Sequence, residues 1–295
     1  MKILIAGSTG LVGEALVAYL TSQGHTIKRL VRHDPSPNDI PWNPEEGLLD
    51  PSDLENSDAL INLSGENISS GRWTADKKRR ILASRVQSTQ TLCRALSEIN
   101  SPPGVFINTS ATGYYGDRGD VEVTESSPRG TGFLADVCDQ WEAAVAELDR
   151  PDIRKVRLRL GVVLSPKGGA LGKMLGPFKF GLGGVIGSGN QYISWIGIDD
   201  LVKVFEYALN TASLQGAVNA VTPTPVTNRE FTKALGKVLH RPTFFAMPKF
   251  LAQLAFGEMA NETILCSTRV APKKLLDSGF AFSYPELEGC LSHEL

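Results

Sequence analysis

At the start of the chain, a continuous run of apolar residues is followed by apolar residues at helical spacing. Residues 2–6 form a short, largely apolar run that ends at Gly7, which is typical of a strand buried on both faces of a parallel sheet. From Leu11 to Leu20 the apolar residues recur at helical spacing, and Gly24 stands where such a helix commonly ends. Residues 26–31 predict a second strand. The first thirty residues therefore predict a strand–helix–strand unit.

The same alternation returns further along the chain. Strand-like runs cover residues 59–63, 105–110 and 156–164, and helical spacing covers residues 74–99 and 132–148. Repeated strand–helix–strand units predict an α/β fold, a Rossmann-type doubly wound parallel sheet with helices on both faces. A smaller mixed C-terminal substrate region is expected beside it.

The pattern changes after Ser165, where glycines crowd residues 168–189 and predict loops. Helices are predicted over 199–209 and 228–239, with a short strand over 217–221 between them. We therefore predict a Rossmann domain over 1–165, to which 196–222 returns. Residues 166–195 and 223–295 are predicted to form a smaller substrate-side domain, with a largely helical tail from residue 248.

Composition narrows the class of protein. A chain of 295 residues can bury a large core, and a net charge of −2 gives no reason to expect nucleic acid or an acidic membrane surface as a partner. A small molecule is the expected partner, and a homodimer is compatible with the sequence. The four cysteines are far apart and lack zinc-site spacing, so we expect reduced thiols, no metal and a cytoplasmic protein. No apolar stretch is long enough for a signal peptide or a membrane span.

A glycine-rich loop stands between the first strand and the first helix. Dinucleotide-binding folds place glycines there for a tight turn, for close approach of the backbone to a pyrophosphate, and for packing of the helix on the sheet. The N–H groups at the start of the helix then receive the phosphates. The expected cofactor-binding residues of this loop are Gly7, Ser8, Thr9, Gly10, Leu11, Val12 and Gly13. A tight turn without a ligand is the alternative, which the flanking strands and helix disfavour.

The end of the second strand bears on the choice between NAD and NADP. About twenty residues beyond the last glycine, an NAD site places a carboxylate on the ribose hydroxyls. This chain has Val31 there, followed by Arg32. A guanidinium binds a phosphate bidentately, so the sequence favours NADP. Arg32 as a solvated surface charge, or Asp34 as a ribose ligand for NAD, are the alternatives.

Two further segments, residues 58–65 and 109–116, complete a resemblance to the extended short-chain dehydrogenases/reductases, which include the sugar-nucleotide epimerases and dehydratases. A more specific set of segments resembles the atypical YfcH-type branch of the epimerase family. These segments are 62–68, 72–73, 84–86, 183–189, 194–196 and 272–280. The resemblance covers nearly the whole chain and implies NADP binding, a small family-specific C-terminal domain and no agreed substrate.

The resemblance also implies roles for particular residues. Leu63, Ser64 and Gly65, followed by Glu66, are expected along the cofactor at the end of their strand, as is Thr109. Ser110 resembles the catalytic serine that hydrogen-bonds a substrate carbonyl or alcohol, although counting back from Tyr115 places Ala111 there instead.

The chain departs from this superfamily at its proton-transfer pair. The Tyr-x-x-x-Lys motif, in which the lysine lowers the tyrosine pKa, is absent, and its two positions fall on Leu134 and Cys138. Arg85 stands where an asparagine is common. A leucine exchanges no proton, so the usual mechanism does not transfer to this chain.

Other groups are candidates for that chemistry. The candidate catalytic residues are Ser110, Tyr114, Cys138 and Arg85, the last as an oxyanion clamp and also a cofactor contact. Tyr115, Glu66 and Asp136 remain alternatives as acid or base. Packing roles for the tyrosines and for Cys138, and an ion pair between Arg85 and Glu66, are equally open.

We therefore predict an NADP(H)-binding, oxidoreductase-like protein of the epimerase family. It would perform hydride transfer or epimerisation on a small substrate through a non-standard acid/base set. Four cations, Arg72, Lys173, Lys179 and Arg269, favour an acidic or nucleotide-linked substrate. The alternative is a non-catalytic NADP(H) sensor or scaffold, in which the cofactor's redox state controls association with a partner.

Overall fold

The computed structural model describes residues 1–295. Its strands are β1 (Lys2–Ala6), β2 (Thr26–Val31), β3 (Ile40–Pro41), β4 (Ala59–Asn62), β5 (Val105–Ala111), β6 (Glu122–Val123), β7 (Arg154–Leu160), β8 (Val162–Ser165), β9 (Tyr192–Ile193), β10 (Trp195–Gly197), β11 (Gly216–Ala220), β12 (Val226–Thr227) and β13 (Arg269–Val270). Its α-helices are α1 (Leu11–Ser22), α2 (Ala75–Glu98), α3 (Phe133–Ala146), α4 (Gly169–Lys179), α5 (Ile198–Asn210), α6 (Asn228–Val238), α7 (Lys249–Phe256), α8 (Lys273–Asp277) and α9 (Leu287–Glu294). Short 3-10 turns cover Pro51–Leu54 and Thr112–Tyr115, and a π-helix covers Ala260–Ile264.

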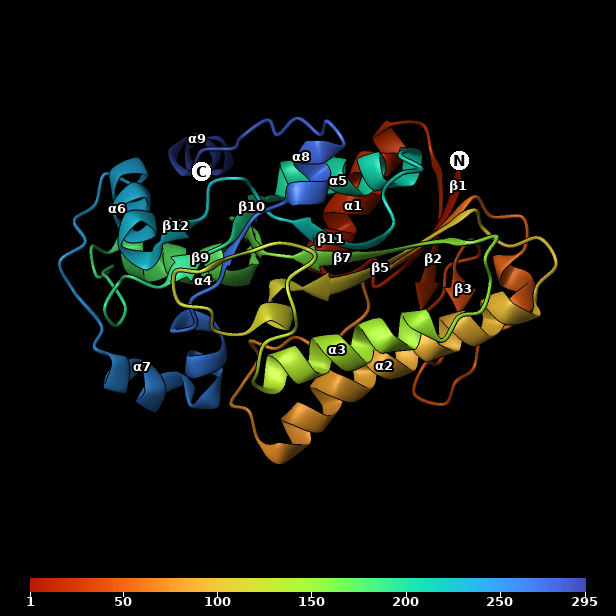
Figure 1. Ribbon diagram of the computed structural model, residues 1–295, viewed down its shortest axis with the longest axis horizontal. Coiled ribbons are helices and arrows are strands. Elements are labelled where there is room, and N and C mark those ends of the chain that lie inside the picture. The colour runs from red at the N-terminus through yellow and green to blue at the C-terminus, as the bar shows by residue number, and fades with distance from the viewer.

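A seven-stranded parallel sheet organises the N-terminal part (Figure 1). Its strand order is β11-β7-β5-β4-β1-β2-β3, and every pair in it is parallel. From β1 the chain first adds β2 and β3 on one side, and it then crosses to the other side of β1 to add β4. The carboxyl ends of β1 and β4 therefore mark the switch point, where ligands of open α/β sheets bind. This confirms the predicted fold class.

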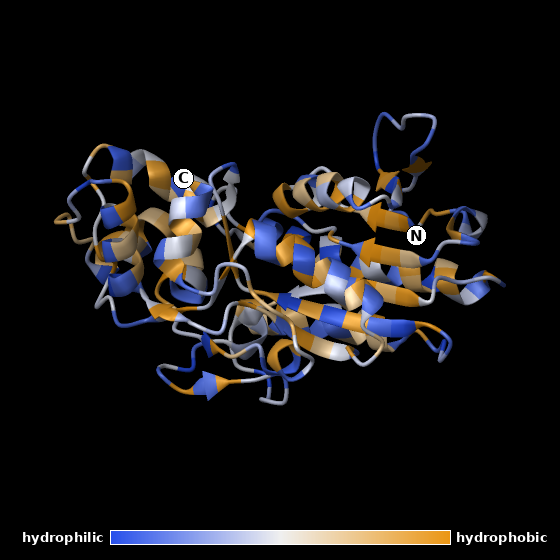
Figure 2. Cartoon of the chain, turned by 90° about the horizontal axis from the view of Figure 1, so that it is seen from above, coloured by the Kyte–Doolittle hydropathy of each residue, from blue (hydrophilic) through white to orange (hydrophobic).

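Side chains that alternate along each strand fill two separate cores. Ile3 and Ile5 of β1 pack toward α1 and α5, while Leu4 and Ala6 pack toward α2 and the end of α3. Apolar strands with helices on both faces bury nearly every side chain of β1 and β4. Figure 2 shows these strands as hydrophobic ribbons between helices of mixed character.

Helices α4, α6, α7 and α9 gather with β9 and β12 at the other end of the molecule (Figure 1). A third core joins α4, α6, α9 and the small β8–β10 sheet around the fully buried Trp195. β11 belongs to the large sheet, where Ala217 is paired with Arg157. The division into domains at residues 165, 195 and 222 stays a prediction.

Two local predictions were wrong. The strand expected over 156–164 is two strands, because the chain turns away from the large sheet at Gly161, where a Cβ would lie 2.7 Å from the backbone oxygen of Ser194. The loop expected over 168–189 contains helix α4, which buries Leu171, Leu175 and Phe178 at helical spacing. No helix has both the length and the apolar character needed to cross a bilayer.

Candidate functional site

The loop between β1 and α1 brings the backbone close to the neighbouring strand. Gly7 has a φ of +78°, and a Cβ on it would lie 2.6 Å from the carbonyl carbon of Leu63. A Cβ on Gly13 would lie 2.3 Å from the backbone oxygen of Gly7. Neither clash can be relieved by a flexible side chain, since both involve backbone atoms. These two glycines are therefore required by the geometry of the loop.

The same loop leaves hydrogen-bonding groups free. Helix α1 starts at Leu11, and its N-cap residue Gly10 supplies no side-chain hydrogen bond. The hydroxyl of Ser8 is buried without a partner, while Thr9 is exposed and Val12 half-buried. Free N–H groups at a helix start, together with an unpaired buried hydroxyl, fit an anionic group such as a pyrophosphate.

Arg32 directly follows β2, next to the dinucleotide loop. β2 lies beside β1, with Leu30 paired to Ala6. The side chain of Arg32 is 58% exposed, and its nearest carboxylate, on Glu45, lies 3.9 Å away. Such a guanidinium is free to reorient onto a phosphate. Asp34, the alternative ligand for a ribose, is exposed and adopts a φ of +48°.

The segment that follows β4 lies directly beside the 7–13 loop, since Gly7 approaches the backbone of Leu63 and Ser64. The Ser64 amide donates to Oδ1 of Asn62 (3.0 Å), and the Thr109 hydroxyl donates to the backbone oxygen of Asn62 (2.9 Å). Asn62 also donates to Asn108 at 2.8 Å, within the buried sheet. These bonds fix the backbone that carries residues 63–65 against the end of β5.

Glu66 and Arg85 lie beside residues 63–65 but do not form an ion pair with each other. Glu66 pairs with the buried Lys77 at 2.5 Å, and this hydrogen bond lowers the pKa of Glu66. Arg85 instead donates to the backbone oxygens of Glu66 (3.1 Å) and Ile81 (2.9 Å). Its guanidinium lies over the Trp141 ring. The guanidinium carbon also lies 3.1 Å from the position that a Cβ on Gly65 would take. Burial lowers the pKa of Arg85.

The positions of the missing tyrosine and lysine face the turn after β5. A Cβ on Gly113 would lie 3.2 Å from Leu134 and 3.9 Å from Sγ of Cys138. Burial raises the pKa of the Cys138 thiol to about 11, with a further contribution from Glu142 that Arg85 and the Ser110 hydroxyl oppose. The structure therefore brings Ser110, Cys138 and Arg85 together, with the thiol protonated at neutral pH.

Ser110 belongs to a buried polar network that the sequence did not reveal. Its hydroxyl donates to Oε1 of Glu142 at 2.8 Å. Arg159 forms a two-pronged pair with the same carboxylate at 2.7 and 2.8 Å. Arg159 also donates to the Tyr115 hydroxyl (2.9 Å), which donates to Asn219 (2.7 Å). Burial lowers the pKa of Arg159, but its bonds to Glu142 outweigh this effect and the pKa is raised overall.

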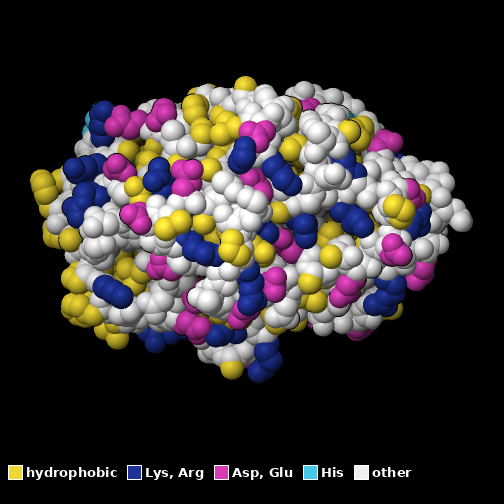
Figure 3. Space-filling view, in the orientation of Figure 1, with side chains coloured by type: hydrophobic (Ala, Val, Ile, Leu, Met, Phe, Trp, Pro, Cys, Tyr) yellow, Lys and Arg dark blue, Asp and Glu magenta, His cyan; other side chains and the backbone are white.

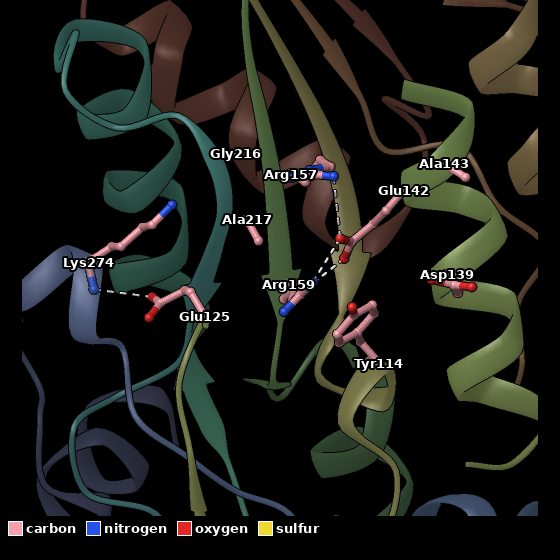
Figure 4. Close-up of a pocket in the computed structure, with 10 residues that line it drawn as sticks. All are labelled: Tyr114, Glu125, Asp139, Glu142, Ala143, Arg157, Arg159, Gly216, Ala217 and Lys274. Carbon is pink, nitrogen blue, oxygen red and sulfur yellow. Dashed lines mark hydrogen bonds and ion pairs between the residues drawn. The ribbon is translucent and has the colours of Figure 1, made fainter. Parts of the chain in front are cut away.

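The far side of this network opens into a polar pocket of about 400 Å³ (Figure 4). The pocket lies between α3, β7, β11 and α8. Tyr114 lines it, with its ring stacked 3.5 Å from the guanidinium carbon of Arg159. Glu142 also lines this pocket, and its side chain is 5% exposed. Tyr114 belongs to this pocket and Tyr115 is buried in the network.

A residue of the C-terminal tail closes the start of α3. Gly132, the N-cap residue, has a φ of +111° and no side chain, and a Cβ there would lie 2.7 Å from the Glu262 carboxylate. Glu262, on the π-helix, accepts a hydrogen bond from the Leu134 amide at 3.1 Å. π-Helical turns are frequent at functional sites. Glu262 thus caps α3 at the position where the usual tyrosine would stand.

Sequence reasoning missed Glu142, Arg159 and Glu262. Glu142 follows Cys138 by one helical turn, and Arg159 stands in a strand where cations alternate with apolar residues. That alternation was a usable signal for a polar layer between β7 and α3. No comparable local signal pointed to Glu262.

Comparisons with known proteins agree with this architecture. The family model described as the NAD dependent epimerase/dehydratase family matches residues 3–220, and a domain of unknown function, DUF1731, matches residues 247–294. An epimerase family protein of Mycobacterium bovis is 41% identical over 292 residues, covering 99% of this chain and 96% of its own. The crystal structure of human epimerase family protein SDR39U1 with NADPH superposes with a TM-score of 0.93 at 36% identity, covering 100% of this chain and 99% of that one. UDP-glucuronic acid 4-epimerase from Bacillus cereus, 17% identical with a TM-score of 0.78, covers 100% of this chain and 95% of its own and shares the fold. This protein therefore belongs to the NAD dependent epimerase/dehydratase family, in the group that also carries DUF1731.

Proposed function

We propose that this protein binds NADP(H) and performs hydride transfer, alone or within an epimerisation, on a small substrate that is acidic or nucleotide-linked. The observation that carries the proposal is the loop at residues 7–13, where backbone contacts exclude side chains on Gly7 and Gly13 and the start of α1 offers free N–H groups. The crystallisation of the human relative with NADPH supports this choice of cofactor.

In this proposal Arg32 distinguishes NADP(H) from NAD(H). Its exposed guanidinium meets only the exposed Glu45 carboxylate, at 3.9 Å, so it can turn to bind the phosphate of the ribose. We expect Arg32→Gln to lower the preference for NADPH over NADH about tenfold or more, since a charge-assisted bidentate contact is lost. Fluorescence titration with both dinucleotides measures this ratio. Lys28→Gln, which removes one charge from β2, the strand that Arg32 follows, is the matched control. An unchanged ratio in Arg32→Gln would contradict the assignment.

The chemistry would use Ser110 and Glu142 in place of the usual tyrosine and lysine. The bound nicotinamide supplies or accepts a hydride at the substrate's carbonyl or alcohol carbon. Because the Ser110 hydroxyl donates a hydrogen bond to Glu142, the lone pairs of its oxygen remain free to accept a hydrogen bond from a substrate hydroxyl. A proton leaving the substrate can pass to Oγ of Ser110 while the serine proton moves to Oε1 of Glu142. The polar pocket behind Glu142 then allows exchange of that proton with solvent.

Cys138 and Arg85 would take supporting roles. A thiol whose pKa is raised to about 11 stays protonated and can donate a hydrogen bond, but it is a poor base near neutral pH. Arg85 is a fixed positive charge beside Gly65 and can stabilise developing negative charge near the cofactor.

The test of this chemistry is turnover by the full chain with NADPH and a panel of aldehydes, ketones and nucleotide sugars. For any pair that reacts, we expect Ser110→Ala to lower kcat while NADPH affinity stays within about twofold, since Ser110 does not lie in the 7–13 loop. Glu142→Gln loses a buried ion pair, so its folded fraction is measured first, and we expect a lower kcat per folded molecule. Tyr114→Phe, which keeps the ring on Arg159, is the control. Unchanged turnover in both variants would exclude the Ser110–Glu142 pair.

A second function is favoured by Leu134 and Cys138, which leave the usual acid/base positions without a tyrosine or a lysine to transfer the proton. In that reading the protein is a non-catalytic NADP(H) sensor or scaffold. It requires that NADP⁺ and NADPH bind with different affinities or change the association state. Equal affinities together with unchanged sedimentation in both cofactors would exclude it.

A further inference from the structure

The large exposed apolar side chains of this protein are concentrated in one place. All four strongly exposed phenylalanines, Phe180, Phe244, Phe245 and Phe250, lie between the end of α4 and the start of α7, with Phe180 and Phe244 83% and 86% exposed. Leu182, Leu251 and Leu254 are exposed in the same segments. Soluble proteins seldom leave such a patch uncovered, and it commonly marks an interaction site. We call these seven residues the phenylalanine patch.

The two segments that form the patch are held together by backbone contacts. The Phe245 amide donates to the backbone oxygen of Gly183 at 3.3 Å, and the Met247 amide donates to Val185 at 2.8 Å. Arg241 donates to the backbone oxygen of Lys179 at 2.8 Å. Helix α7 continues the surface and buries Ala252 fully while it exposes Phe250 and Leu254. Residues 179–185 and 241–254 therefore form one continuous surface.

Every charged side chain in these two segments is a cation. No aspartate or glutamate occurs between Asp152 and Asp199, or between Glu230 and Glu258. Lys179, Arg241 and Lys249 are exposed in the same two segments as the phenylalanine patch, and none of them has a carboxylate within ion-pair distance. In the space-filling view, hydrophobic side chains gather over α7 at the lower left with Lys and Arg among them (Figure 3). On a chain whose net charge is −2, this is a local excess of positive charge.

We propose that the phenylalanine patch docks on an anionic lipid bilayer surface. Aromatic and leucine side chains beside unpaired lysines and arginines are the combination that places a protein at the headgroup level, with rings in the acyl boundary and cations on lipid phosphates. A second copy of the chain fits less well, because self-association of this surface would bring the same unpaired cations together. The net charge of the whole chain gave no reason to expect an acidic membrane partner, because that sum combines the positive charge of this surface with negative charge elsewhere on the chain.

The surface borders the candidate site. The backbone oxygen of Leu254 in α7 is hydrogen-bonded by Arg72, from the loop that follows β4, and Glu258 pairs with Lys78 of α2 at 2.7 Å. Docking through α7 would therefore place residues 66–78, which follow the cofactor-side segment 63–65, close to the bilayer.

Vesicle co-sedimentation tests the proposal with the full chain. We expect binding to vesicles of phosphatidylcholine mixed with phosphatidylglycerol, weakened by added salt, and little binding to phosphatidylcholine alone. Replacing Lys179, Arg241 and Lys249 by Gln should weaken binding about fivefold for each charge removed. The matched control removes three charges elsewhere, through Lys28→Gln, Arg94→Gln and Lys203→Gln, and should bind as the unchanged protein does.

A variant that adds a fluorescent side chain tests docking directly, so the result does not depend on whether a charge-removing variant folds. In Phe250→Trp, the emission of the new tryptophan should shift to the blue on anionic vesicles, whereas Val121→Trp, at an exposed apolar position outside the patch, should not shift. Three outcomes would overturn the proposal. These are no binding to either vesicle, equal and salt-independent binding to both, and a dimer without vesicle binding that Phe250→Ser dissociates in sedimentation.

Discussion

Glu142→Gln should destabilise the fold strongly, because it leaves the charge of Arg159 buried without its counterion. The side chains of Glu142 and Arg159 are only 5% and 4% exposed, and the pair is joined by two hydrogen bonds. Breaking a buried pair by removing one partner costs about 3–5 kcal/mol, a large share of the ~5–15 kcal/mol that stabilises a typical domain. Urea unfolding followed by tryptophan fluorescence measures the change as a shift in midpoint at constant slope.

Two further variants separate burial from charge. Asp277→Asn breaks the pair between Lys273 and Asp277, whose side chains are each 61% exposed, and should cost less than about 0.5 kcal/mol. The double replacement Glu142→Leu with Arg159→Met removes both charges and should recover most of the loss. A cost below about 1 kcal/mol for Glu142→Gln, or a double variant no more stable than the single one, would refute the reasoning.

Three other substitutions probe the cofactor loop, the buried thiol and the cap of α3. Gly13→Ala forces a Cβ to within 2.3 Å of a backbone oxygen and should weaken NADPH binding tenfold or more in a fluorescence titration, whereas Gly176→Ala, where a Cβ meets nothing within 4 Å, should leave binding unchanged. The Cys138 pKa is raised from about 9 to about 11, so its stabilising contribution is full below pH 9 and declines by about 1.4 kcal/mol per pH unit up to pH 11. Cys138→Ala should lose less stability than the unchanged protein over that range, and parallel pH profiles in urea unfolding would contradict this. Glu262→Ala removes the only side-chain acceptor at the start of α3 and should cost about 1 kcal/mol, measured as a lower Tm, and an unchanged Tm would show that the cap contributes nothing.

Local sequence signals predicted the parts of the fold that depend on local chemistry. The run at residues 2–6, the glycines at 7, 10 and 13 and the helical spacing after Leu11 each follow from sterics within about twenty residues. The strand at 156–164 and the loop at 168–189 were mispredicted because tertiary contacts decided them. Gly161 releases the chain from the sheet against Ser194, and α4 forms despite its glycines because Leu171 and Phe178 are buried in the third core.

The residues of the candidate site also fall into those that local sequence could identify and those that it could not. Ser110 and Cys138 could be selected from their places in the pattern, and the structure puts them next to each other. Their partner Glu142 could not be selected, because its role depends on Arg159, on a strand seventeen residues later whose side chain could equally have faced the other side of the sheet. Glu262 is more remote, since 128 residues separate it from the amide that it accepts. Contacts of this length are set by packing of whole elements and leave no trace in local spacing.

The contact between Glu262 and the start of α3 also constrains how the chain is made and how it can be divided. On the ribosome the large sheet is complete at residue 220, while the carboxylate that caps α3 emerges only some forty residues later. A fragment that ends before residue 247 would carry all seven strands of the large sheet. However, its helix α3 would lack the Glu262 cap, and the surface that the C-terminal segment covers would be exposed. The C-terminal segment, which is synthesised last, thus completes the capping of a helix that is synthesised much earlier. Shortening this segment, or exchanging it between relatives, would therefore change the stability of α3.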